Sequence, residues 1–192
     1  TAVSMALNGK PGVSTEMRKR IIAEAEKAGY DFSRLQLKKN HSGDIYCIIY
    51  RAHNAILNYT PIFSELTEGI EAECRHKGYG LKTLQVYENT DDLTQVVEEL
   101  RICGCVGMIL LGTELSAGIC RRFLEASLPM VLLDASFDAI DCSSVLINNV
   151  QGAYLATGYL IDRCNEQPGH LCSSYSIANF SERKTGFQKE VG

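Results

Sequence analysis

The hydrophobic pattern of the chain changes near residue 45. Before this point, apolar residues recur at the three- and four-residue steps of amphipathic helices. The pattern predicts one helix that ends at Asn8-Gly9 and a second that runs from the N-cap Ser14 to Gly29. The turn GKPGV separates them. The polar stretch 31–44 continues neither pattern and is predicted to be a linker.

From residue 45 onward, short apolar runs alternate with helical patterns. Runs rich in β-branched and aromatic residues predict buried strands at 45–50, 79–86, 106–112, 130–134, 143–148 and 170–175. The segments between them predict helices at 60–78, 91–100, 116–126 and around 153–160, with Thr60 as an N-cap before Pro61. Such a series predicts an α/β fold with a mostly parallel sheet covered on both faces.

The composition is that of an ordinary globular protein, with 45% hydrophobic and 22% charged residues. No apolar run approaches the roughly 18 residues that span a bilayer, and no charged-then-apolar leader is visible. A cytoplasmic protein without a membrane partner is therefore expected. The eight cysteines mostly lie in apolar runs and are predicted to be reduced and buried. No metal is expected, because Cys103-Gly104-Cys105 lacks a second cysteine pair or nearby histidines.

The charge is distributed unevenly along the chain. Residues 1–40 hold eight Lys/Arg and four Asp/Glu, a net charge of +4, whereas the rest of the chain carries a net charge of −8. A basic end on an acidic body predicts that any contact with a polyanion is confined to the first forty residues. A solvated helix face would give the same count, so the charge alone does not decide.

Specific motifs run through residues 1–32, TAVSMALNGKPGVSTEMRKRIIAEAEKAGYDF. Matches to the pattern TVSxxLNGxxxVSxxTRxRIxxxAxxLGY fall at Val3-Ser4, Leu7-Asn8-Gly9, Val13-Ser14, Arg18, Arg20-Ile21 and Gly29-Tyr30. This is the headpiece pattern of the lactose-repressor family. Later stretches agree with the same family in order, namely TPIFSELTEGIE, VGMILLG with PMVLLD, VLINNVQGAYLAT and FSERKTGF. The chain therefore resembles a LacI/GalR-type transcriptional regulator over essentially its whole length.

The resemblance implies four segments. These are a partial helix-turn-helix DNA-binding headpiece at 1–30, a hinge or linker at 31–44, the N-terminal lobe of an effector-sensing domain at 45–165 and the start of its C-terminal lobe at 166–192. The expected fold is thus the partial headpiece followed by a periplasmic-binding-protein-like, doubly wound parallel sheet. By comparison with the family, both ends look truncated, and a partial headpiece is expected to bind an operator poorly.

The resemblance also assigns DNA contacts within the headpiece. Thr1 and Met5 occupy base-facing positions of the recognition helix, and Ser4 and Asn8 lie near phosphates. Many relatives have an arginine where this chain has Met5. Methionine offers a base only apolar contact, so the operator preference differs, or Met5 packs on its own domain.

In relatives, a hinge helix after the Gly-Tyr pair inserts a leucine into the minor groove. The corresponding residue is Leu37, or Leu35 in the other register, and Lys38 and Lys39 then reach phosphates. The two leucines can equally pack onto the sensor domain.

Ligands of open α/β sheets bind outside the carboxyl ends of the strands. The residues expected there are Phe63, Asn148, Asn149, Asn179 and Arg183. In relatives, the matching aromatic residue stacks on the effector and the arginine of the RxxGF motif binds its polar groups. Phe63 is as readily a core residue as a ligand platform. Arg183 is the best supported of these residues, and its alternative role is that of a surface charge on a helix. Asn148 stands where an aspartate is common in the family, which removes a charge and changes ligand choice. An aromatic ring with amide and guanidinium donors suits a sugar or a similar hydroxyl-rich molecule.

The resemblance thus predicts a sequence-specific DNA-binding repressor, a homodimer controlled by a small-molecule effector. No GxSxG, Walker or GxGxxG motif is present and the four histidines are scattered, so neither an enzyme nor a cofactor is expected. The alternative is a periplasmic-type sugar-binding protein, which shares the sensor fold but has no DNA-binding role.

Overall fold

A five-stranded parallel sheet forms the centre of the structure, a computed structural model that describes residues 2–7, 12–30, 42–53 and 61–192. The strands are β1 (Asp44–Arg51), β2 (Gly80–Tyr87), β3 (Cys105–Leu111), β4 (Met130–Leu133) and β5 (Ser143–Val145). Their order in the sheet is β2-β1-β3-β4-β5, and each neighbouring pair is parallel. The predicted α/β class with a parallel sheet is confirmed.

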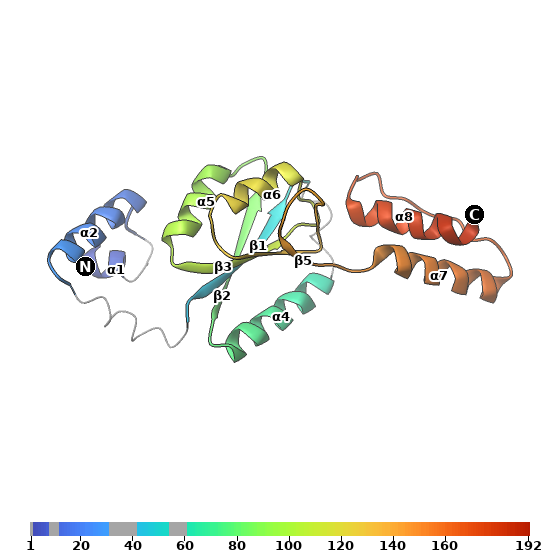
Figure 1. Cartoon of the computed structure of the whole chain (residues 1–192), viewed down its shortest axis with the longest axis horizontal. Helices are drawn as coiled ribbons and strands as arrows, with labels where there is room; N and C mark the ends of the chain where they lie inside the picture. The colour runs from blue at the N-terminus through green and yellow to red at the C-terminus, as the bar shows by residue number, and fades with distance from the viewer. Residues whose placement is uncertain (1, 8–11, 31–41, 54–60) are drawn as a thin grey trace.

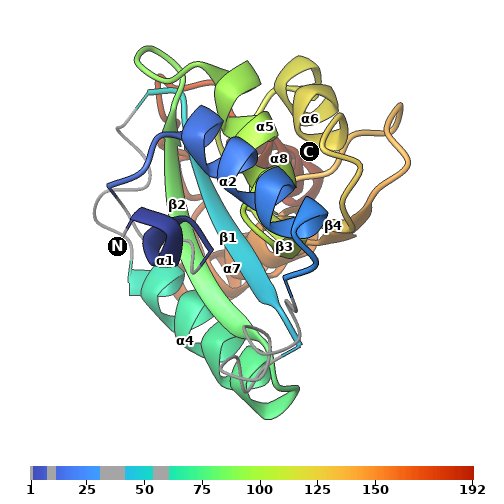
Figure 2. The same ribbon diagram turned by 90° about the vertical axis from the view of Figure 1, so that its left-hand side faces the viewer.

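Helices cover both faces of this sheet (Figures 1 and 2). Helix α4 (Pro61–His76) lies on one face, and α5 (Leu93–Ile102) and α6 (Ala117–Leu124) lie on the other. Two of these helices begin with a side-chain cap. The Asp92 carboxylate accepts a hydrogen bond from the amide of Thr94 at 2.9 Å, and the Ser116 hydroxyl accepts one from Ile119 at 3.3 Å. The sheet is therefore doubly wound, as predicted.

The core packs most densely between the sheet and the α5–α6 face. Ile48, Leu110 and Leu132, from three adjacent strands, are at most 1% exposed. Phe123 of α6 is fully buried and meets the ring of Tyr50 edge to face, with ring centroids 6.5 Å apart and an interplanar angle of 87°. Apolar strands buried on both sides require this arrangement, because helices must cover both faces of a parallel sheet.

All eight cysteines are free thiols. Cys47, Cys74, Cys105 and Cys120 are buried, and Cys103 and Cys142 are half-buried. Only Cys164 and Cys172 are exposed. Most of the thiols therefore behave as small core residues, which is the role that their apolar surroundings in the sequence predict.

Two short helices precede the sheet, α1 (Ala2–Leu7) and α2 (Thr15–Lys27), and they pack on each other. The Ser14 hydroxyl accepts a hydrogen bond from the amide of Met17 at 3.3 Å, so the predicted N-cap is confirmed. Met5 is half-buried, and its methyl group lies 2.7 Å from where a Cβ on Gly12 would be. Met5 thus packs against its own helix pair in this structure, and its base-facing role stays a prediction.

Beyond the sheet, α7 (Asn149–Cys164) and α8 (Ala178–Val191) lie side by side and extend away from it (Figure 1). A Cβ at Gly186 would collide with the carbonyl of Val150 and lie 2.9 Å from the Ala153 Cβ. Only glycine permits this approach, which explains the glycine of the RxxGF motif as a packing residue. No described helix is both long and apolar enough to cross a bilayer.

Two strand predictions need correction. The segment 170–175 is not a strand, and Leu171 within it is 98% exposed. A strand needs a neighbour to satisfy its backbone N–H and C=O groups, and the described residues offer none beside this segment. The strand predicted at 143–148 ends at Val145, because the following residues lead directly into α7.

The Phe123→Ala substitution is expected to lower the free energy of unfolding by about 3–5 kcal/mol, because it leaves a cavity under Tyr50. Urea denaturation followed by circular dichroism measures the loss. Leu155→Ala is the control, since this side chain is 59% exposed and its removal should cost at most about 0.5 kcal/mol. Equal losses for the two variants would contradict the packing described here.

Candidate ligand-binding site

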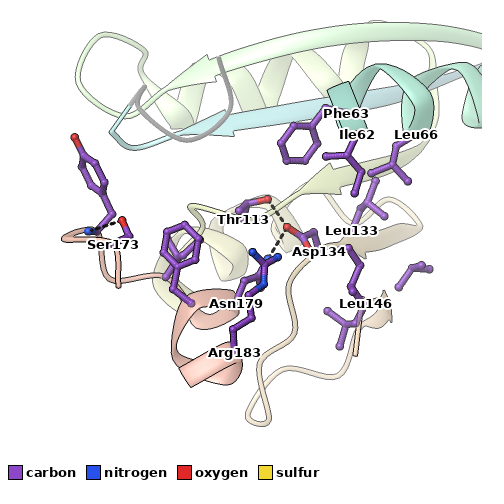
Figure 3. A pocket seen from close by; sticks show the side chains of 15 residues that line it. Ile62, Phe63, Leu66, Thr113, Leu133, Asp134, Leu146, Ser173, Asn179 and Arg183 are labelled. Carbon is purple, nitrogen blue, oxygen red and sulfur yellow. Dashed lines mark hydrogen bonds between the residues drawn. The ribbon is translucent and has the colours of Figure 1, made fainter. Parts of the chain in front are cut away.

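A cavity of about 480 Å³ opens at the carboxyl ends of the strands. Helix α4, the ends of β4 and β5, and the first turns of α8 form its walls (Figure 3). Its lining comprises Ile62, Phe63, Leu66, Thr113, Leu133, Asp134, Val145, Leu146, Ile147, Ser173, Tyr175, Ile177, Asn179, Phe180 and Arg183. The size and the mainly apolar lining with a few polar groups are those of a small-molecule site.

Asp134 links the sheet to α8 within this cavity. One oxygen of its carboxylate accepts a hydrogen bond from the Thr113 hydroxyl at 2.6 Å and another from the Asn179 amide at 2.8 Å (Figure 3). Asp134 adopts a left-handed backbone conformation with φ 62°, which non-glycine residues rarely take. A strained residue whose carboxylate faces a cavity is a feature of functional sites.

Arg183 is held in place by α7. Its Nε donates a hydrogen bond at 2.8 Å to the side-chain oxygen of Asn149, a buried residue. The amide nitrogen of Asn149 in turn donates to the carboxylate of Glu182 at 2.9 Å. The Arg183 guanidinium also lies 5.9 Å from the ring centroid of Phe180. Held in this way, Arg183 lines the cavity.

The structure therefore separates the predicted effector residues into two groups. Phe63, Asn179 and Arg183 line the cavity together, although they come from two helices more than a hundred positions apart in the sequence. Asn148 and Asn149 are not among the described residues that line it. Asn149 acts on the cavity through Arg183.

Asn148 is the N-cap of α7. Its side-chain oxygen accepts a hydrogen bond from the amide of Gln151 at 3.0 Å, and its amide nitrogen donates to the Gln151 side chain. An aspartate would cap the helix equally well. Asn148 thus serves as a helix cap in this structure, and its role in effector binding stays a prediction.

The sequence interpretation missed Thr113 and Asp134 as site residues. Each follows a buried apolar strand, β3 or β4, within two residues. A polar residue directly after a buried parallel strand is the signal that would have found them.

The predicted DNA-contacting residues are not tested by the structure. Thr1, Asn8, Leu37 and Lys38 lie outside the described residues, and so does the side chain of Ser4. Their roles stay predictions. In the described part of the chain, no group of three or more His, Cys, Asp or Glu side chains is arranged to hold a metal ion.

Two tyrosines of β1 remain neutral phenols. Burial raises the pKa of Tyr46 to about 12. Burial, and then the nearby Glu88 carboxylate, raise the pKa of Tyr50 well above its ordinary value. Burial likewise raises the pKa of the Cys120 thiol. These groups stay protonated at neutral pH and are not activated nucleophiles.

Comparison with known families shows which family this fold and cavity belong to. Residues 44–191 match the model described as periplasmic binding proteins and sugar binding domain of LacI family. The chain belongs to this family. The cavity thus lies in a LacI-type sugar-binding domain, and the resemblance expected from the motifs is confirmed.

Individual relatives differ in how much of the chain they match. The HTH-type transcriptional repressor PurR of Vibrio vulnificus is 26% identical over 198 residues, covering 100% of this chain and 56% of the repressor. A transcriptional regulator CelR–cellobiose complex has a TM-score of 0.63 at 19% identity, covering 98% of this chain and 56% of that one. A periplasmic solute-binding protein of Actinobacillus succinogenes with bound D-allose has a TM-score of 0.62 at 20% identity, covering 78% and 54%. The chain thus spans about half the length of these relatives.

The Asn148→Ala substitution is expected to lower the free energy of unfolding by about 1 kcal/mol, because α7 loses its cap. Asn148→Asp should retain the stability of the parent, since aspartate caps a helix as well as asparagine does. Its negative charge also interacts favourably with the positive end of the helix dipole. Urea denaturation followed by far-ultraviolet circular dichroism compares the two. The capping explanation fails if both substitutions destabilise the protein equally.

Proposed function

We propose that this chain is part of a transcriptional repressor that binds operator DNA and responds to a small-molecule effector in the cleft at the carboxyl ends of its strands. The observation that carries the proposal is the extent of the match. The PurR repressor aligns with the whole chain, including the residues of α1 and α2 that precede the sugar-binding domain. The periplasmic solute-binding protein with bound D-allose covers only 78% of the chain.

The effector we propose is a sugar or a related hydroxyl-rich metabolite. The Arg183 guanidinium offers donors, the Asp134 carboxylate offers an acceptor, and apolar side chains form the remaining walls. A hydroxyl group both donates and accepts, so vicinal hydroxyls satisfy this pair of charged groups. The relatives solved with cellobiose and with D-allose support the same class.

The remaining features of the proposal follow the family. The DNA contacts lie in the basic first forty residues, the protein acts as a homodimer in the cytoplasm, and it performs no catalysis. We also place the boundary between the two lobes near residues 146–149 instead of at 165/166, since α7 packs along α8 and extends away from the sheet. The alternative function is that of a sugar-binding protein without a DNA-binding role.

Thermal-shift screening against sugars, nucleosides and phosphorylated metabolites tests the effector site. A ligand that binds only the native state raises the melting temperature by mass action. Arg183→Ala should abolish the shift given by a hit, because the guanidinium lines the cavity. Its exposed neighbour Lys184 supplies the control, and Lys184→Ala should keep the shift. Without ligand, Lys184→Ala should melt within about 2 °C of the parent, whereas Arg183→Ala should melt a few degrees lower, because the buried Asn149 oxygen loses its donor. A shift that survives Arg183→Ala would place the ligand elsewhere.

Capture of fragmented genomic DNA separates the two candidate functions, with the protein used as its cell makes it. Binding to operator DNA should weaken steeply as salt rises, because phosphate contacts release counterions. Arg20→Glu on α2 should weaken binding about tenfold or more, whereas Lys77→Glu next to α4, the same charge change elsewhere, should leave it unchanged. A sugar-binding protein without a DNA-binding role would capture no specific fragment, and neither substitution would matter.

A further inference from the structure

Glu114 is a buried carboxylate in the turn between β3 and α6. It is 8% exposed, and one of its oxygens accepts two backbone hydrogen bonds, from the amide of Ala52 at 2.7 Å and from that of His53 at 2.8 Å. The two amides directly follow β1. A charged acceptor forms stronger hydrogen bonds than a neutral one, so Glu114 fixes the start of the loop after β1 to the turn after β3.

The loop that Glu114 holds makes a contact across the cleft. The His53 ring stacks on the Tyr175 ring, with centroids 5.8 Å apart and an interplanar angle of 29°. Tyr175 belongs to the segment that leads into α8, and its amide donates to the Ser173 hydroxyl at 3.1 Å (Figure 3). The contact therefore joins the sheet to the segment that carries Asn179 and Arg183.

The two rings of this contact line two neighbouring cavities. A smaller cavity of about 110 Å³ is lined by His53 and Glu114, among others, and it shares Thr113, Asp134 and Ile177 with the larger one. Tyr175 lines the larger cavity. The stacked pair and the Asp134–Asn179 hydrogen bond are thus two links between the sheet and the start of α8, and both border the proposed effector.

We propose that Glu114 is a positioning residue for effector binding, which orients His53 against Tyr175 and so holds the two walls of the cleft together. Glu114 itself is not among the residues that line the larger cavity. Without its carboxylate, the amides of Ala52 and His53 lose their acceptor. The backbone at these two residues then no longer holds the imidazole ring of His53 against Tyr175. The contact across the cleft is then lost although both rings are still present. The consequence for effector binding rests on the function proposed above. The contact between His53 and Tyr175 does not depend on that function.

Nuclear magnetic resonance tests the contact without any ligand. In the parent chain, a nuclear Overhauser effect should join the ring protons of His53 and Tyr175, and the amides of Ala52 and His53 should exchange slowly with deuterium. Glu114→Ala should remove the ring contact and speed exchange of the two amides about tenfold or more. Glu114→Gln should keep both features, because both hydrogen bonds fall on one oxygen and the glutamine oxygen can accept them.

Glu125→Ala is the matched control. Glu125 is an exposed carboxylate at the end of α6 that pairs with Arg122, and its loss should change neither measurement. If Glu114→Ala does not melt cooperatively, Glu114→Asp replaces it with the same expectation, since aspartate keeps the charge but is one methylene shorter. Retention of the ring contact in the Ala or Asp variant, or its loss in Glu114→Gln, would overturn the positioning role.

The consequence for binding is measured with the sugars that shift the parent's melting temperature, starting with cellobiose and D-allose. Glu114→Ala should raise their dissociation constants about tenfold, and Glu114→Gln should leave them within about twofold. Equal affinities in the parent and Glu114→Ala would overturn the role in binding, even where the ring contact is lost. If no sugar shifts the parent, the proposed effector class is wrong, whereas the resonance measurement still decides whether Glu114 positions His53.

Discussion

The parallel register of β3 and β4 is the constraint on which the cleft depends. Leu111 and Leu133 are partners in adjacent strands, so the backbone leaves β3 and β4 at the same level of the sheet. Thr113 and Asp134 follow within two residues and are therefore brought together at the sheet edge, 2.6 Å apart. An antiparallel pair would have sent these two residues to opposite ends of the sheet. The polar part of the cavity thus follows from strand direction before any helix is placed.

Helix α8 reaches this edge through side-chain contacts with the sheet. The Asp134 carboxylate accepts a hydrogen bond from the Asn179 amide. Asp134 also has a left-handed backbone conformation, which costs about 1–3 kcal/mol for a residue other than glycine. Aspartate tolerates the left-handed region better than most residues, because its short polar side chain can hydrogen-bond locally. Two hydrogen bonds to a charged acceptor, at about 1.5–3 kcal/mol each, offset that cost. The strain is therefore maintained by the same contacts that shape the site.

Local chemistry made most of the elements predictable. The cap Ser14, the helix starts near Asp91 and Ser116 and the apolar runs of the strands were readable, because each is set by neighbouring residues. The segment 170–175 has the same apolar character but forms no strand, since a strand depends on a partner that the run itself does not specify. The capping role of Asn148 was missed for a related reason. Its side chain serves the first turn of α7, a role that its position before a helix could have indicated.

Residues that act through others were the least predictable part of the site. Arg183 was identified by its motif, but its orientation depends on Asn149, which lies 34 positions earlier. Glu114 holds amides 61 and 62 positions away, and no pattern in the sequence joins these segments. Such pairings arise only once the sheet has brought its loops to one edge.

For the proposed regulator, a change in the cleft also has to reach the residues that precede the sheet, where the DNA contacts are predicted. The ion pair between Lys19 of α2 and Glu98 of α5 is exposed, with side chains 55% and 47% accessible, and pairs of this kind contribute about 0–1 kcal/mol. Driving a two-state equilibrium from almost wholly one state to almost wholly the other takes about 5.5 kcal/mol of differential binding. This ion pair is therefore too weak to transmit the effector signal. A regulator built on this chain therefore needs a stronger coupling than this pair supplies, for which the predicted linker at 31–44 and the predicted contacts with DNA are the candidates.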